Sequence, residues 1–149
     1  MKQKTILLVE DNQNDIGLTQ RAFEKCRIYN DLIVKEDGQE ALDFLFGKDG
    51  KPGAADNILP MLVMLDLKLP RIDGLEVLRR IRADVRTHRM PVVILTSSKE
   101  EEDVAASYDL GANSYIRKPV DFQQFAQAVQ NLGLYWLVLN EPPPTIKKG

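Results

Sequence analysis

The sequence has very little of what several common classes of protein require. Its 149 residues include a single cysteine, Cys26, so no internal disulfide can form and no zinc cluster can be assembled around it. The helical spacing of its neighbours predicts that Cys26 is a small buried apolar residue. No apolar run approaches the roughly 20 residues of a membrane helix, and the run at residues 6–9 is too short for a signal peptide.

Charge of either sign is not in excess. The formal net charge is -2 at pH 7, which gives no reason to expect nucleic acid or an anionic membrane as a partner. We therefore expect that the protein binds neither, and the lack of a signal peptide or membrane span predicts that it is cytoplasmic. One basic cluster is present, but aromatic residues are missing beside it, and we interpret it as a solvated helix face. Its members are Arg79, Arg80, Arg82, Arg86, His88 and Arg89.

Short apolar runs alternate with helical patterns along the whole chain. The runs predict strands at residues 5–9, 32–35, 61–66, 92–95 and 114–117. Between and after them, the patterns predict helices from Asn12 or Asn14 to about Arg27, and over 38–46, 74–81, about 99–110 and 121–132. Residues 48–57 are predicted to be a loop. Five strands alternating with five helices predict an α/β fold, a flavodoxin-like doubly wound parallel sheet of order 2-1-3-4-5 with helices on both faces.

The third predicted strand is a near-continuous apolar run that ends in one carboxylate, Asp66. In open parallel sheets, ligands bind outside the carboxyl ends of the strands, near the point where the strand order reverses. A carboxylate there is poorly placed for stability and well placed for chemistry. The alternative is that Asp66 only caps a turn, since Asp is a common turn residue.

Four predicted strands end in polar side chains, namely Glu10, Asp11, Asp66, Thr96 and Lys118. Neighbouring strands lie about 4.8 Å apart, so the three carboxylates would crowd together. Two carboxylates 4 Å apart repel by about 4 kcal/mol at an effective dielectric of 20, which a divalent cation such as Mg²⁺ would relieve. A carboxylate nucleophile, a cation, a hydroxyl and a fixed ammonium match the needs of an arriving phosphoryl group. Each residue alone has an ordinary structural explanation, but the combination is specific.

The ordered motifs resemble those of the receiver domain of two-component response regulators, over roughly residues 4–134. The matching motifs are Val-Glu-Asp at 9–11, Leu-Asp-Leu-Lys-Leu-Pro at 65–70, Asp-Gly at 73–74, Thr-Ser at 96–97 and Lys-Pro at 118–119. The resemblance implies that Asp66 accepts a phosphoryl group from a phosphohistidine of a sensor histidine kinase. It also implies that Asp11, Asp66 and the backbone carbonyl of Lys68 bind Mg²⁺, with Glu10 acting on the metal mainly through water.

The same resemblance assigns the remaining site residues. Thr96 would bond one phosphoryl oxygen and Lys118 would pair with another. Tyr115 matches the switch aromatic of the family, which turns inward when the threonine is drawn toward the phosphoryl group. Lys68 and Ser98 occupy places that tune the lifetime of the acyl phosphate in this family. No other cofactor is implied, and the protein would not be an enzyme beyond its own phosphorylation and dephosphorylation.

The segment at 135–149 is expected to extend a single domain that spans residues 1–149. Apolar residues at 134–139 fall on more than one helical face before three prolines end the pattern, which favours a partner surface. We expect a homodimer through the fifth strand, the last helix and this extension; the alternative is that the extension folds back on its own domain. The extension with Trp136, and the long loop before the third strand, resemble small stand-alone response regulators of bacterial phytochromes, so a phytochrome-type kinase is the expected partner.

Three other functions fit parts of the pattern. A phosphatase of the haloacid dehalogenase type also uses a strand-end aspartate and Mg²⁺, but it needs a second acid where Lys68 stands. A flavin-binding electron carrier shares the fold, but residues 10–12 would repel its phosphate. A receiver-like scaffold without phosphorylation is disfavoured because all five expected site residues are present. The glycines at 47–53 could suggest a phosphate cradle, but they precede the third strand, at the wrong edge of the sheet.

Overall fold

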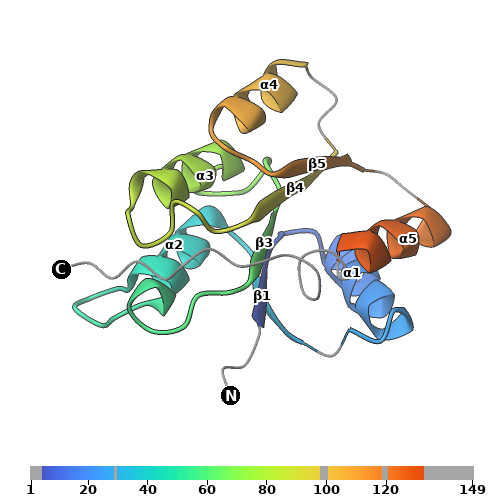
Figure 1. Cartoon of the computed structure of the whole chain (residues 1–149), viewed down its shortest axis with the longest axis horizontal. Helices are drawn as coiled ribbons and strands as arrows, with labels where there is room; N and C mark the ends of the chain where they lie inside the picture. The colour runs from blue at the N-terminus through green and yellow to red at the C-terminus, as the bar shows by residue number, and fades with distance from the viewer. Residues whose placement is uncertain (1–4, 29, 98–100, 119–120, 133–149) are drawn as a thin grey trace.

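A five-stranded parallel sheet forms the centre of the computed structural model, which describes residues 5–28, 30–97, 101–118 and 121–132 (Figure 1). The strands are β1 (Thr5–Val9), β2 (Asp31–Lys35), β3 (Leu62–Leu65), β4 (Val92–Thr96) and β5 (Ser114–Arg117). Their order is β2-β1-β3-β4-β5, and every pairing is parallel. The predicted flavodoxin-like order is therefore confirmed.

Helices follow the strands, and each of the first three begins at a residue whose side chain caps it. The helices are α1 (Gln13–Lys25), α2 (Gly38–Phe46), α3 (Gly74–Ala83), α4 (Glu101–Asp109) and α5 (Phe122–Leu132). Asn12, Asp37 and Asp73 accept hydrogen bonds from main-chain N–H groups of the first turn that would otherwise be unpaired. Within the described parts of the chain, no helix is both long and apolar enough to cross a membrane.

The hydrophobic core lies in two layers, one on each face of the sheet. Alternate residues of β1 and β3 point to opposite faces, so Leu7 and Val63 join the layer under α2 and α3. Ile6 and Met64 join the layer under α1 and α5. The same division of helices is visible in Figure 1. Because β3 is buried on both faces, with no residue more than 2% exposed, its carboxyl end is held firmly in place.

Three predictions about individual segments need correction or lie outside the described residues. The predicted loop at 48–57 contains a short 3₁₀ helix, η1 (Ala54–Asp56), which is too brief to show a periodic pattern. Ser98 and the whole of the 135–149 extension with Trp136 lie outside the described residues. The predicted dimer surface is therefore not tested by the fold.

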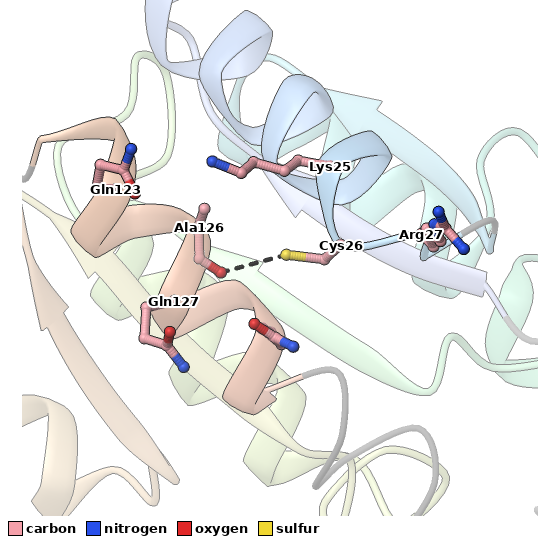
Figure 2. A pocket seen from close by; sticks show the side chains of 7 residues that line it. Lys25, Cys26, Arg27, Gln123, Ala126 and Gln127 are labelled. Atoms are coloured by element: carbon pink, nitrogen blue, oxygen red, sulfur yellow. Dashed lines mark hydrogen bonds between the residues drawn. The ribbon is translucent and has the colours of Figure 1, made fainter.

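Cys26 is half-buried rather than buried, because it lies at the end of α1 instead of within its apolar face. Its Sγ donates a hydrogen bond to the carbonyl oxygen of Ala126 in α5, at 3.3 Å. Cys26 borders a hollow of about 290 Å³. Figure 2 shows this hollow between the end of α1 and α5, with Lys25 and Gln127 also lining it. The prediction of a fully buried side chain was wrong, since the chain leaves the helix at this residue.

The basic cluster divides into two kinds of residue. Arg79 and Arg80 are exposed and pair with Glu76 on the surface of α3, as a solvated face requires. Arg82 and Arg86 contradict that prediction because both are tied to distant segments. Arg82 donates to the carbonyl oxygens of Gly111, His88 and Met90, and Arg86 donates to the carboxylates of Asp84 and Asp56.

Candidate functional site

The carboxyl ends of β1 and β3 bring the three predicted carboxylates together. Val9 and Leu65 are partners in the parallel ladder, and the main-chain N–H of Asp66 donates to the carbonyl oxygen of Val9 at 3.0 Å. Glu10 and Asp66 therefore follow side by side, and they are 1% and 7% exposed. Carboxylate oxygens from Glu10, Asp11 and Asp66 all lie within 4.8 Å of one another.

Asp66 is oriented by contacts to both of its carboxylate oxygens. Oδ1 accepts a hydrogen bond from the main-chain N–H of Lys68 at 3.3 Å, and Oδ2 lies 3.4 Å from Lys118 Nζ. The first contact is that of a turn cap, so Asp66 does cap a turn, as the alternative in the sequence analysis proposed. The second contact joins Asp66 to a cluster of acidic groups around one lysine, which a turn cap alone does not require.

Gly74 allows α3 to begin directly against the end of β3. A Cβ atom at this position would lie 2.1 Å from the carbonyl oxygen of Asp66. The main-chain N–H of Gly74 donates to the carbonyl oxygen of Leu67 at 2.9 Å, which fixes the segment that carries Asp66. The close approach of helix and strand is therefore possible only without a side chain.

Lys118 is the cation of the cluster, and one of its partners was not predicted. Its Nζ donates to Glu10 Oε1 at 2.6 Å and to Asp15 Oδ2 at 2.7 Å. Asp15 belongs to the first turn of α1, where an acidic residue also suits the helix dipole. No local sequence signal marks Asp15, because its contact with Lys118 joins residues 103 positions apart and depends on the side-chain conformations of both.

The ionisation of Glu10 and Lys118 reflects their burial and their mutual contact. Burial and the neighbouring charge of Asp66 raise the pKa of Glu10 to about 7, although its hydrogen bond with Lys118 lowers it. Burial acts to lower the pKa of Lys118, but hydrogen bonds to Asp15 and Glu10 outweigh burial and raise it. Lys118 therefore stays charged at neutral pH. An additional positive charge nearby would favour the ionised form of Glu10.

The cluster opens into a hollow of about 520 Å³ whose donors suit a hard divalent cation. Asp11 and Asp66 line it with Lys68 and Lys118, and Asp11 is exposed to solvent. Carboxylate oxygens are the ligands that Mg²⁺ prefers in proteins, and three of them converge here. The residues present therefore fit this metal; the role of the Lys68 carbonyl stays a prediction.

Neither Thr96 nor Tyr115 lines this hollow: Thr96 ends β4, whereas Tyr115 lies within β5, opposite Ile94. Thr96 is fully buried at the end of β4, and its carbonyl oxygen accepts from the main-chain N–H of Lys118 at 2.7 Å. Tyr115 in β5 is half-buried and packs against the core layer under α2 and α3. The exposed Ser97, which the sequence analysis did not assign, borders the hollow instead.

A doubly wound parallel sheet with acidic residues and a buried lysine at the carboxyl ends of its strands defines a receiver-type domain. The chain belongs to the response regulator receiver domain family, whose model matches residues 6–130. The resemblance found in the sequence motifs is confirmed. Members of this family are signalling proteins that partner with sensor histidine kinases.

Two curated relatives match this chain over most of both sequences. "Probable methanogenesis regulatory protein FilR2" of Methanothrix harundinacea is 39% identical over 138 residues, which cover 93% of this chain and 86% of FilR2. Response regulator Rcp1 of Synechocystis sp. is 40% identical over 135 residues, which cover 90% of this chain and 89% of Rcp1. Neither relative extends far beyond the part that it shares with this chain.

Solved structures of response regulators from phytochrome systems are also similar. The phosphorylated cyanobacterial phytochrome response regulator RcpA has a TM-score of 0.83 at 38% identity, covering 96% of this chain and all of RcpA. The Mn²⁺-bound form of Rcp1 has a TM-score of 0.80 at 38% identity, covering 95% of this chain and 99% of Rcp1. The bacteriophytochrome response regulator RtBRR has a TM-score of 0.75 at 49% identity, covering 96% of this chain and 86% of RtBRR. The predicted resemblance to phytochrome-associated response regulators is thus confirmed.

Proposed function

We propose that this protein accepts a phosphoryl group from a sensor histidine kinase on Asp66 and signals in the phosphorylated state. The main observation behind this proposal is the position of Asp66 at the end of β3. Lys118 Nζ lies 3.4 Å from one of its carboxylate oxygens, and the carboxylates of Glu10 and Asp11 lie beside it. Support from relatives comes from RcpA, whose structure is that of a phosphorylated protein, and from Rcp1, which binds Mn²⁺.

In the proposed reaction, a carboxylate oxygen of Asp66 attacks the phosphorus of a phosphohistidine. The new P–O bond forms as the P–N bond breaks, and the electron pair of the P–N bond returns to the imidazole nitrogen of the kinase. Lys118 pairs with one phosphoryl oxygen and the hydroxyl of Thr96 donates to another. Tyr115 then turns inward beside Thr96, which alters the surface around β5.

Mg²⁺, when bound, neutralises charge on the phosphoryl oxygens. Asp11, Asp66 and the backbone carbonyl of Lys68 would hold it, with Glu10 acting through water. The protein would turn over no separate substrate, since Lys68 stands where a phosphatase of similar chemistry needs an acid.

The wider setting of the proposed function rests on expectations from the sequence, and the similarity to phytochrome response regulators supports only the choice of kinase. We expect a single receiver domain over residues 1–149, in the cytoplasm, that receives its phosphoryl group from a phytochrome-type kinase and binds neither membrane nor nucleic acid. We also expect a homodimer through β5, α5 and residues 135–149. Sedimentation of the free and phosphorylated protein tests this, and monomer alone at tens of micromolar protein would exclude the dimer.

Acetyl phosphate with Mg²⁺ provides the direct test of phosphoryl acceptance. Intact-protein mass spectrometry should show one labile phosphoryl adduct in the natural protein, none in Asp66→Asn, and none when EDTA removes the metal. Asp49→Asn is the matched control, because Asp49 is exposed and has a φ of 52°, which Asn tolerates well. A stable adduct in Asp66→Asn would refute the assignment of the acceptor.

A further inference from the structure

Lys68 joins the segment after β3 to α4. Its Nζ lies 3.5 Å from Asp103 Oδ2, and the side chain of Lys68 is 64% exposed whereas that of Asp103 is 15% exposed. Asp103 lies in the first turns of α4, and its carbonyl oxygen accepts from the hydroxyl of Ser107 at 2.8 Å. The ion pair therefore connects the segment that carries Asp66 with a separate helix.

Lys68 also borders two hollows. It lines the hollow of about 520 Å³ that contains Asp66 and Lys118, and a second hollow of about 470 Å³ that is also lined by Leu75 and Asp103. Its main-chain N–H donates to Asp66 Oδ1 at 3.3 Å, which fixes the base of the side chain beside the acceptor. The four-carbon stem is flexible, so the ammonium can serve either hollow without a change in the backbone.

We propose that the Lys68–Asp103 ion pair is a latch on α4, and that the Lys68 ammonium leaves Asp103 for the phosphoryl group when Asp66 is modified. This inference rests on the proposed function of Asp66. No covalent bond is made or broken in the exchange; one ion pair replaces another.

Charge and exposure favour this exchange. An ion pair with a largely exposed lysine is weak, whereas a phosphoryl group carries more negative charge than a carboxylate and offers several acceptor oxygens. Asp103 is the more buried partner, so the ammonium moves and the carboxylate stays with α4. Phosphorylation then removes one cation from the surroundings of Asp103 and loosens the tie between α4 and the acceptor segment.

Beryllium fluoride with Mg²⁺, a phosphoryl analogue, measures the exchange by calorimetric titration. Asp103→Asn should bind it about two- to fivefold more tightly than the natural protein, because the unliganded state has lost the competing pair. The matched control is Asp43→Asn, which breaks a similar surface pair with Lys48 at 3.9 Å, with side chains 65% and 24% exposed. Asp43→Asn should leave the affinity unchanged.

A double-mutant cycle isolates the latch from other contacts of Asp103. In a Lys68→Gln background, Asp103→Asn should no longer change the affinity for beryllium fluoride. Hydrogen exchange supplies a second readout: amides of α4 should exchange faster in unliganded Asp103→Asn and Lys68→Gln than in Asp43→Asn.

The outcomes separate the latch from the proposed function. If Asp103→Asn and the natural protein bind beryllium fluoride with equal affinity, the latch alone is overturned. The same holds if Asp103→Asn changes the affinity equally in the natural and the Lys68→Gln backgrounds. Failure of the natural protein to bind beryllium fluoride or accept phosphate would overturn the proposed function and the latch with it.

Discussion

Asp11 is the most exposed of the three carboxylates that converge at the strand ends, and without a bound metal ion we expect it to contribute mainly repulsion. Asp11→Asn should therefore raise the free energy of unfolding in EDTA by about 1 kcal/mol, the energy of two unit charges 4 Å apart in bulk water. Urea denaturation in EDTA and in MgCl₂ measures this.

The same substitution should remove most of the stabilisation that Mg²⁺ gives the natural protein, since a proposed ligand is lost. Asp49→Asn, on an exposed loop, should change neither value. If MgCl₂ raises the free energy of unfolding of Asp11→Asn as much as that of the natural protein, Asp11 is not a ligand of the metal.

Asp15 competes with the reaction for the ammonium of Lys118, which it contacts at 2.7 Å. Asp15→Asn releases Lys118 and lowers the negative charge that repels an anionic phosphate donor. The rate of phosphorylation by acetyl phosphate should rise about two- to fivefold, the range expected for losing a partly exposed ion pair. A lower rate would show instead that Asp15 holds Lys118 in its working position.

At the residue scale, the sequence located the acids at the strand ends but not all of their partners. Glu10, Asp66 and Lys118 could be placed because each ends a predicted strand or directly follows one. Asp15 lies in a helix, and its contact with Lys118 depends on the side-chain conformations of both residues. Ser97 was missed for a similar reason, because motif order does not tell which of two adjacent hydroxyls borders a hollow.

At the scale of elements, helices with a capping residue and an apolar face were predicted well, whereas segments held by tertiary contacts were not. Asp37 and Asp73 cap α2 and α3 as local sequence requires. The turn η1 is stabilised by packing and by a few main-chain bonds, one of which joins Asn57 to Ala54. Local patterns contain little information about such a turn.

The junction of β3 and α3 gives a prediction for a single element boundary. Gly74→Ala places a Cβ 2.1 Å from the carbonyl oxygen of Asp66, so α3 must move away from the acceptor segment. We expect a loss of about 1–3 kcal/mol in the free energy of unfolding, which is typical of overpacking, with slower phosphorylation. Urea denaturation and the acetyl phosphate assay measure the two effects.

Gly17→Ala is the matched control for this boundary. Gly17 lies within α1, and nothing lies within 4 Å of the Cβ that Ala would add. This substitution should stabilise the protein by about 0.5–1 kcal/mol, because Ala loses less backbone entropy in a helix. Equal effects of the two substitutions would show that α3 does not need its close approach to β3.

At the scale of the whole molecule, the alternation of strands and helices was enough to predict the sheet order, but not the ties that join distant segments. Arg82 is the clearest case. Its guanidinium, on α3, donates to the carbonyl oxygen of Gly111 at 3.0 and 2.7 Å and to that of Met90 at 2.7 Å. A basic residue on an amphipathic helix gives no sign of acceptors that lie 29 residues away.

Arg82→Lys tests how much this tie contributes to the molecule as a whole. Lysine keeps the charge, but it lacks the planar fork that reaches the segments before β4 and after α4 together. We expect the free energy of unfolding to fall by about 2–4 kcal/mol, since several charged hydrogen bonds are lost. Arg79→Lys, on the exposed side of the same helix, should change it by less than about 0.5 kcal/mol. Hydrogen exchange should quicken at residues 88–92 and 110–113 in Arg82→Lys only, and a uniform change across the sheet would show that Arg82 acts on global stability rather than as a tie between these segments.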